Sequence, residues 1–359
     1  MFLKQLYARN FRNFDEISVN FVDGVNEVVG DNAQGKTSLL EALFLCMTAS
    51  SFRSQHLKDL IRHAHKGFFV EASFEKCGVD HQVGISYDGE KRRVFLNGAA
   101  CETPTVLLGL MPGVASTPDD IAVVKGQPSL RRRYLDLMIA QIDPVFVHHL
   151  SRFMRALKQR NVLLKQKQIG SISCWEEELA RSSAYISVQR KKAVAFVGEK
   201  AAEFFSAFSS EKLPLVLHYV SSVRPVDDVE EMQKCFIQEF DKKRAQEVHL
   251  GVTLVGPHRD DVQILIGEKP AREFASIGQS ALTACAMRLA EWHYLERETR
   301  SRPLMIVDDF GAALDSTRKK LLFNELGRLG QLFLSSHSSL QSGANSHTLT
   351  IHDGKLCSF

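Results

Sequence analysis

The alternation of apolar and polar residues at the start of the chain predicts β-strands. Residues 16–21 alternate between polar and apolar side chains, which is the period of a half-buried strand. Val25–Val29 is typical of a short buried strand, and after a glycine-rich turn the apolar spacing over Lys36–Met47 is helical. Further strands, with Asp88-Gly89 and Asn97-Gly98 as turns, are predicted at Phe68–Phe74, Gln82–Tyr87 and Arg93–Leu96.

Near residue 120 the pattern becomes helical. Three stretches have helical spacing: Pro128–Lys167, interrupted at Asp143-Pro144, then Trp175–Phe208 and Val229–Glu247. Strands are predicted at Leu215–Val220, Val248–Val255, Val262–Ile266, Leu304–Val307 and Leu332–Leu334, and helices at Gly278–Glu298 and Thr317–Leu329. We therefore predict an α/β domain built from both ends of the chain, interrupted by a mostly helical insertion. The predicted bounds are 1–124 and 255–359 for the α/β domain and 125–254 for the insertion.

Composition excludes several classes of protein. The chain has 359 residues, of which 44% are hydrophobic and 24% charged, as in ordinary globular proteins. No apolar run approaches the ~18 residues of a membrane span, and the N-terminus lacks the apolar core of a secretory signal. The seven cysteines form no CxxC pair and the histidines no HExxH, so we expect neither a disulfide framework nor a zinc site. A protein of the reducing cytoplasm, without a membrane partner, is the simple interpretation.

Positive charge is concentrated in one segment. Lys125–Lys167 carries ten Lys or Arg and two Asp, a net charge of +8, whereas the whole chain carries only +3. Such a segment indicates a polyanionic partner, although a solvated helix face would look the same. Arg152, Arg155 and Lys158 recur every three residues and share one face of the predicted helix. Rows of this kind contact nucleic-acid phosphates without reading the base sequence.

The segment from Gly30 to Thr37 fits the pattern GxxxxGK[ST] and lies between a predicted strand and a predicted helix, which is the context that the motif requires. Small residues let backbone N–H groups surround a phosphate, and the helix N-terminus adds a positive dipole. Lys36 would neutralise phosphate charge, and the Thr37 hydroxyl would bind Mg²⁺. The candidate phosphate-binding residues are Gly30, Asp31, Asn32, Ala33, Gln34, Gly35, Lys36, Thr37 and Ser38.

A second motif ends the apolar strand Leu304–Val307 with two carboxylates. Asp308 is the candidate Mg²⁺ residue together with Thr37, and Asp309 lies where a base would orient an attacking water. Two adjacent acids repel each other unless a cation is near, which favours a metal.

Two weaker signals complete the set. Ser276, Gly278 and Gln279 precede a long predicted helix and suit phosphate oxygens, although an ordinary helix cap has the same residues. His337 follows a predicted strand, where it would sense a terminal phosphate or serve only a structural role.

The order of phosphate loop, SxGQ, strand with two Asp, Leu-Asp and His resembles the ATPase heads of the ABC class. Within that class the chain resembles the RecF family of recombination mediators, which is related to the heads of SMC proteins. The more specific marks are Asn10–Phe14, Gly35–Ala42, Ser51–Arg53, Pro118–Gly126, Arg131–Asp136, Leu157–Asn161 and Gly256–Asp261. The 238 residues between Thr37 and Ser276 exceed what a transporter subunit of this class inserts, and they lack the heptads of a long coiled coil.

The resemblance implies an ATP- and Mg²⁺-dependent homodimer in which Ser276, Gly278 and Gln279 complete the partner's site. It places Arg12 and Asn13 near the nucleotide and makes Asp309 and His337 the catalytic candidates. It implies DNA binding, to single strands, duplexes or junctions, with Arg131, Arg132, Arg152, Arg155 and Lys158 as candidate contacts. Arg131–Arg133 would instead brace the base of the insertion if they do not contact DNA. RecR and RecO are the implied partners, with RecA loaded indirectly at gaps by a cytoplasmic, nucleoid-associated protein.

Two departures from the family pattern concern hydrolysis. Ser280 and Ala281 follow Gln279 where the family has Gln-Arg, and Ala312-Ala313 replaces a polar pair before Leu314-Asp315. We therefore expect weak, DNA-dependent ATP hydrolysis. The alternatives are an ATP-gated scaffold with little turnover and a nucleotide-binding subunit of a transporter.

Overall fold

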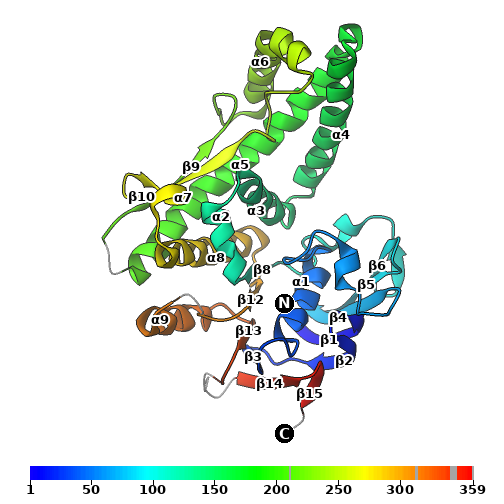
Figure 1. Ribbon diagram of the computed structural model, residues 1–359, viewed down its shortest axis with the longest axis vertical. Helices are drawn as coiled ribbons and strands as arrows, with labels where there is room; N and C mark the ends of the chain where they lie inside the picture. Colours follow the sequence, from blue (N-terminus) through cyan, green and yellow to red (C-terminus); the bar gives the residue numbers. More distant parts are fainter. Residues whose placement is uncertain (210–211, 312–313, 340–345, 358–359) are drawn as a thin grey trace. The chain divides into compact units, whose positions relative to one another are not determined.

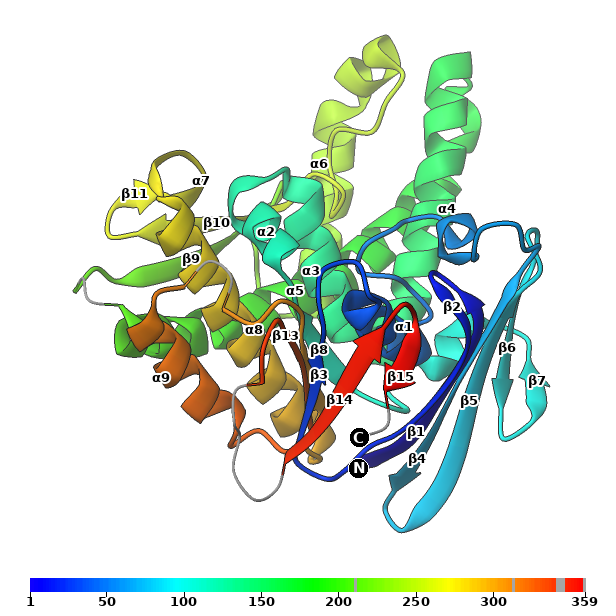
Figure 2. The ribbon, with the colours of Figure 1, turned by 60° about the horizontal axis from the view of Figure 1, so that its bottom comes forward.

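The computed structural model describes residues 1–209, 212–311, 314–339 and 346–357, so Ala312 and Ala313 lie outside the described residues. The chain divides into two compact units. The first consists of Met1–Asp120 and Ile277–Phe359, and the second of Ile121–Ser276. Figures 1 and 2 show the elements of both units.

The first unit contains a mixed sheet that is largely parallel. Its strand order is β15-β14-β3-β13-β12-β8, and β15 is the antiparallel strand at one edge. The bounds are β3 Val25–Val29, β8 Gly113–Ser116, β12 Leu304–Val307, β13 Leu332–Ser336, β14 Ser346–His352 and β15 Lys355–Cys357. Because neighbouring parallel strands end at the same edge, the segments that follow β3, β8, β12 and β13 meet there.

An antiparallel sheet of six strands forms the other layer of this unit. Its order is β2-β1-β4-β5-β6-β7. The bounds are β1 Phe2–Phe11, β2 Phe14–Asn20, β4 Phe68–Lys76, β5 Val79–Tyr87, β6 Arg92–Leu96 and β7 Ala99–Cys101. Helix α1 (Lys36–Thr48) packs against both sheets (Figure 2), and every residue of it except Thr37 is buried. A helix enclosed in this way is largely apolar, which explains the apolar residues from Leu39 to Met47; the buried Glu41 within this run is paired with Arg12.

Two longer helices also belong to the first unit. Helix α8 (Ile277–Thr299) packs against β8, and α9 (Ser316–Leu326) precedes β13 in the chain. The N-cap of α9 is Asp315, whose carboxylate accepts hydrogen bonds from the N–H groups of Thr317 and Arg318. Short 3₁₀ turns occur at Leu57–Leu60, Pro104–Leu107 and Pro118–Asp120.

The second unit is mostly helical, with one small antiparallel sheet in the order β11-β10-β9. Helix α5 is central: it packs against α3, α4, α6 and β9 (Figure 1). The helices are α2 Ile121–Lys125, α3 Pro128–Ala140, α4 Pro144–Gln166, α5 Ser173–Phe208, α6 Val229–Leu250 and α7 Ala271–Phe274, with a 3₁₀ turn at Ile169–Ser171. The strands are β9 Leu215–Val220, β10 Asp261–Ile266 and β11 Lys269–Pro270.

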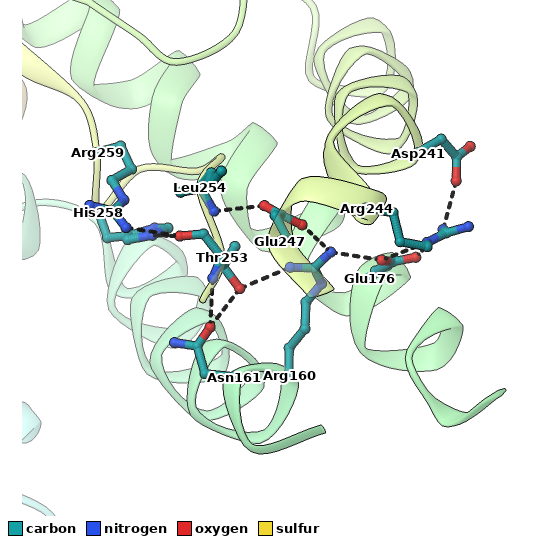
Figure 3. A network of polar contacts seen from close by, with 10 residues as sticks. All are labelled: Arg160, Asn161, Glu176, Asp241, Arg244, Glu247, Thr253, Leu254, His258 and Arg259. Carbon is teal, nitrogen blue, oxygen red and sulfur yellow. Dashed lines mark hydrogen bonds and ion pairs between the residues drawn. The ribbon is translucent and has the colours of Figure 1, made fainter. Parts of the chain in front are cut away.

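A buried network of charged residues joins three of these helices (Figure 3). The fully buried Arg160 of α4 donates to Glu176 of α5 at 2.8 Å and to Glu247 of α6 at 2.6 Å. Arg244 adds a second cation at Glu176. The charges therefore balance within the network, as burial of ions requires.

The strand that we predicted at Val248–Val255 is wrong. Helix α6 continues to Leu250 and ends at Gly251, which has φ 69° and caps the helix in the left-handed conformation. The next residues bond to side chains rather than to a strand: Thr253 N–H donates to Asn161 at 2.8 Å and Leu254 N–H to Glu247 at 2.6 Å (Figure 3). Apolar composition alone does not reveal this arrangement.

The second unit extends beyond the bounds that we predicted for the insertion, because β10 pairs with β9 along its whole length. Residues up to Ser276 therefore fold with the helices. Strands β8, β14 and β15 were not predicted from the sequence. Among the described residues no helix is both long and apolar enough to span a membrane.

Candidate functional site

The loop between β3 and α1 requires glycine at two positions. Gly35 has φ 124°, and a Cβ there would lie 2.8 Å from Asn13 Nδ2. A Cβ at Gly30 would lie 2.5 Å from the carbonyl oxygen of Ile351. Asn13 also donates to the Gln34 carbonyl at 2.9 Å, so it supports the loop from behind. The loop thus has the tight curvature by which backbone N–H groups surround an anion.

Lys36 supplies a buried cation beside this loop. Its ammonium donates to the carbonyl oxygens of Gly30 at 2.5 Å and Asp31 at 2.9 Å. Its side chain is buried, and no carboxylate in the described part of the chain forms an ion pair with it. A buried ammonium held only by carbonyl groups is an electrostatically favourable site for an anionic ligand.

Thr37 and the carboxylate at the end of β12 meet directly. Thr37 Oγ1 donates to Asp308 Oδ1 at 2.9 Å, and Ser335 Oγ of β13 donates to the same oxygen at 2.7 Å. Burial raises the pKa of Asp308, while these two hydrogen bonds oppose the rise. A carboxylate and a hydroxyl oxygen are hard ligands of the kind that Mg²⁺ prefers. The donor set therefore fits Mg²⁺.

Asp309 and His337 lie at the same edge of the sheet. His337 Nε2 is 3.7 Å from Asp309 Oδ1, and both side chains are about half exposed. Asp309 has φ 49°, and its N–H donates to Ser335 Oγ at 2.7 Å. The structure thus brings together the two residues that we predicted to be catalytic, although they lie on different strand ends.

Lys36, Thr37, Asp308 and Asp309 face one cavity of about 390 Å³ in the first unit, whereas Gly30, Gln34 and His337 do not line it. It is lined by Asp31, Asn32, Ala33, Gly35, Lys36, Thr37, Ser38, Arg53, Pro118, Asp308, Asp309 and Ser335. Sequence reasoning missed Arg53, Pro118 and Ser335 as site residues. The Ser51–Arg53 motif and the position of Pro118 just after β8 were the available signals, whereas nothing in the sequence marked Ser335.

Arg12 is held by an acidic residue of α1. Its guanidinium is held by Glu41 of α1, with Nε donating at 2.8 Å and Nη2 at 2.7 Å, and Nη1 donates to the Asp59 carbonyl at 2.8 Å. Neither Arg12 nor Asn13 lines the cavity. Both residues hold the segments that surround the cavity instead of facing it.

Gly278 and Gln279 form the first turn of α8, next to Ser276, and none of the three lines the cavity of its own chain. A Cβ at Gly278 would meet nothing within 4 Å. The glycine at this position is therefore not explained by packing within the described chain.

The structure changes the assignment of the basic residues on α3. Arg131 is buried and forms a bidentate ion pair with Asp261 at 2.7 and 2.9 Å. Arg132 Nη1 donates to the Asp260 carbonyl at 2.7 Å. Both guanidinium groups thus join the Arg131–Asp136 motif to the Gly256–Asp261 motif. Of our two interpretations of this cluster, the structure favours bracing over DNA contact.

The three predicted DNA contacts on α4 differ in whether their side chains form ion pairs. Arg152 forms a bidentate pair with Glu178. Arg155 and Lys158 are exposed and have no ion-pair partner among the described residues. They line a shallow groove of about 720 Å³ on the second unit, together with Met154, Leu157, Asn161, Val162 and Lys165. Within the part of the chain that the structure describes, Arg155 and Lys158 are the candidate DNA contacts that are exposed and have neither an ion pair nor a hydrogen bond.

A phosphate loop, a strand-end carboxylate pair and a following histidine on one largely parallel sheet define an ABC-type P-loop ATPase fold, as we predicted. The family model of the RecF/RecN/SMC N-terminal domain matches residues 2–353. A solved SMC head of Pyrococcus furiosus, 15% identical with a TM-score of 0.57 over 99% of this chain and 95% of its own, shares the fold.

Proteins with higher sequence identity to this chain identify its family within this class. The chain is 42% identical over 337 residues to a DNA replication and repair protein RecF of Protochlamydia amoebophila. The matched region covers 94% of each chain. It is 32% identical to the protein of that name in Lactobacillus johnsonii, over 94% of this chain and 92% of that one. A solved structure of the recombination mediator protein RecF-ATP in the RecFOR pathway is 28% identical, with a TM-score of 0.90 over 99% and 97% of the two chains. The chain therefore belongs to the RecF family of DNA replication and repair proteins, which confirms the predicted resemblance.

Proposed function

We propose that the chain is an ATP-gated DNA-binding protein of recombinational gap repair. The observation that carries the ATP-binding part is the contact between Thr37 and Asp308 beside the uncompensated charge of Lys36. These three groups bring a cation, a hydroxyl and a carboxylate to one cavity, as a magnesium–nucleotide complex requires. A solved relative whose title names it RecF-ATP supports the same ligand.

The phosphate loop and the residues at the strand ends have separate roles in this proposal. Gly30 to Ser38 cradle the phosphates of ATP, and Lys36 neutralises their charge. Thr37 and Asp308 hold Mg²⁺, which supplies charge stabilisation to the phosphates when it is bound. Asp309 orients water, and His337, whose Nε2 lies 3.7 Å from Asp309 Oδ1, senses the terminal phosphate. Hydrolysis is weak because Ser280 and Ala281 replace the usual polar residues of the family signature.

Dimerisation completes the site in trans. No atom of the described chain lies within 4 Å of a Cβ built on Gly278, so packing within the chain does not require glycine there. This supports the close approach of a second copy at the first turn of α8. Ser276, Gly278 and Gln279 of one protomer then face the nucleotide that its partner holds. ATP favours the dimer because its terminal phosphate bridges both surfaces.

DNA binding is assigned to exposed cations of the helical unit. Arg155 and Lys158 contact phosphates, and the protein acts on single-stranded, duplex or junction DNA to help load RecA at gaps. RecR and RecO are the proposed protein partners, and the proposed location is the cytoplasm at the nucleoid. The membership in a family of DNA replication and repair proteins supports this assignment.

Titration calorimetry with Mg·ATP tests the nucleotide part. The wild type is expected to bind, and Lys36→Met to lose at least tenfold in affinity because a buried charge-assisted contact is removed. Lys91→Met, which removes an exposed lysine of the same unit, is the matched control. Equal affinity of the wild type and Lys36→Met would contradict the proposal. ATP binding with no measurable turnover in the presence of DNA would support the scaffold alternative over an ATPase.

A further inference from the structure

Glu27 is a fully buried carboxylate on β3, the strand that leads into the phosphate loop. This strand lies inside the sheet, between β13 and β14, and both of these pair with it in parallel. Strands in such a position are normally apolar because both of their faces are covered. A buried carboxylate is costly unless hydrogen bonds or an opposite charge compensate it. The partners of Glu27 therefore indicate what it does.

Two serine hydroxyls from the end of β13 and the segment after it donate to Glu27. Ser336 Oγ donates to Glu27 Oε1 at 3.0 Å, and Ser339 Oγ donates to Glu27 Oε2 at 3.1 Å. These serines begin and end the short segment 336–339, which contains His337. The two oxygens of one carboxylate thus hold both ends of the segment that carries the histidine.

The same end of β13 is also held from the opposite face of the sheet. Ser335 and Ser336 are consecutive strand residues, so their side chains leave the sheet on opposite faces. Ser335 Oγ donates to Asp308 Oδ1 at 2.7 Å, at the end of β12, whereas Ser336 reaches Glu27 on β3. Strands β12 and β3 flank β13. A carboxylate from each neighbouring strand therefore fixes β13 immediately before His337.

His337 depends on this support because its side chain is 58% exposed. An imidazole that protrudes into solvent is not fixed by packing, so the backbone that carries it determines where it lies. Functional side chains of this kind are held in place by hydrogen bonds from residues behind them. Glu27 supplies such bonds without facing the cavity.

We propose that Glu27 is the positioning residue of His337. Through Ser336 and Ser339 it fixes the segment that presents the imidazole to the terminal phosphate of the nucleotide. The inference rests on the proposed function, since it takes the ligand to be ATP. Glu27 does not touch the nucleotide in this arrangement, and its effect passes through His337 alone.

The affinities for Mg·ATP and Mg·ADP, measured by titration calorimetry, test the inference because only ATP carries the phosphate that His337 meets. His337→Ala is expected to lower the preference for ATP over ADP roughly fivefold, as loss of one hydrogen bond does. Glu27→Leu keeps an apolar side chain of similar size but removes both acceptors. It is expected to lower the preference similarly, while its affinity for Mg·ADP stays at the wild-type value. The double variant is expected to prefer ATP no less than His337→Ala does, because Glu27 acts only through His337.

Milder variants separate positioning from loss of the fold. Glu27→Gln has an amide that can accept from Ser336 and donate to the Ser339 oxygen, so it is expected to keep the wild-type preference. Ser339→Ala changes an exposed residue and removes one of the two bonds. It is expected to lower the preference roughly two- to threefold, and it decides the question if Glu27→Leu does not fold. Ser338→Ala, at the exposed serine next to it, is the matched control, and Val28→Ala, at a fully buried residue of β3, controls for stability. Val28→Ala is expected to lower the melting temperature and to leave the preference unchanged.

Three results would overturn the inference. The first is a wild-type preference in Ser339→Ala and in folded Glu27→Leu when His337→Ala has lost it. The second is a wild-type preference in His337→Ala, because the segment would then have nothing to present. The third is an equal loss of preference in Val28→Ala and Ser339→Ala, which would reduce the effect to general stability. If the wild type and Ser338→Ala bind neither nucleotide, the proposed function fails instead, and the inference fails with it.

Discussion

Thr37 Oγ1 lies 2.9 Å from Asp308 Oδ1, although 271 positions separate the two residues in the sequence. The contact forms because β3 and β12 flank β13 in a parallel arrangement, so that their carboxyl ends meet at one edge. The helical unit is inserted between these two halves without separating them.

Glycine substitutions are expected to separate nucleotide binding from dimerisation. Gly35→Ala should reduce the affinity for Mg·ATP at least tenfold, because a Cβ at φ 124° clashes with Asn13. Gly278→Ala should leave ATP binding by the monomer and its melting temperature intact, since the added Cβ meets open space. Sedimentation velocity with Mg·ATP should show that Gly278→Ala no longer dimerises. ATP-dependent dimerisation of Gly278→Ala at wild-type strength would exclude this face as the partner contact.

Arg131 and Arg155 are expected to differ sharply in their effect on stability. Arg131→Ala leaves the partly buried Asp261 without its partner and should lower the free energy of unfolding by about 3 kcal/mol or more. Arg155→Ala removes an exposed, unpaired side chain and should change it by less than about 0.5 kcal/mol. Urea denaturation measures both values. Similar losses for the two variants would show that Arg131 does not brace the second unit.

The salt dependence of DNA binding tests the phosphate contacts. Replacing both Arg155 and Lys158 by Gln should weaken binding and reduce the slope of log K against log salt by roughly 1.8 for duplex DNA, because each phosphate contact contributes about 0.9. Fluorescence anisotropy at several salt concentrations gives the slope. Lys234→Gln, an exposed lysine of α6, is the control. An unchanged slope in the double variant would remove α4 from the DNA interface.

Glu291 is expected to make the first unit less stable as the pH rises. Burial raises its pKa to about 7 from 4.5, against the opposing charge of Arg288, with Asp120 adding to the rise. Between these pH values the folded state binds more protons than the unfolded state, so the free energy of unfolding falls with increasing pH. The loss by pH 8 is of the order of 3 kcal/mol at most.

Melting curves from pH 5 to pH 8 test this pH dependence. The side chain of the Glu291→Gln variant cannot ionise. The melting temperature of this variant should therefore rise relative to that of the wild type as the pH rises. Glu296→Gln, a more exposed acid of the same helix, should follow the wild type. Parallel curves for the wild type and Glu291→Gln would contradict the expected linkage.

Sequence reasoning predicted the parts of the fold that local pattern determines. Leu215–Val220 and Leu304–Val307 are strands with the predicted bounds, and the helix after the phosphate loop begins at Lys36 as expected. The motif residues are also predictable, because a phosphate loop needs glycine and lysine at a set spacing. Asp309 and His337 come together because each follows a strand of the same parallel sheet.

Other features depend on contacts between residues distant in the sequence. Nothing local distinguishes Arg131, which is buried against Asp261, from Arg155, which is exposed. Ser335 is identified as a site residue only by the hydrogen bond that its hydroxyl donates to Asp308 in the folded chain. The segment 251–255 has the apolar composition of a strand. Its backbone N–H groups at Thr253 and Leu254, however, donate hydrogen bonds to the side chains of Asn161 and Glu247 and not to a neighbouring strand.

In the proposed function, ATP controls DNA binding. Fluorescence anisotropy on a labelled gapped duplex, with and without Mg·ATP, tests it most directly in the wild type and in Lys36→Met. We expect salt-sensitive binding that Mg·ATP strengthens in the wild type and leaves unchanged in Lys36→Met. Equal binding by the wild type with and without Mg·ATP, or no binding at low salt, would contradict it.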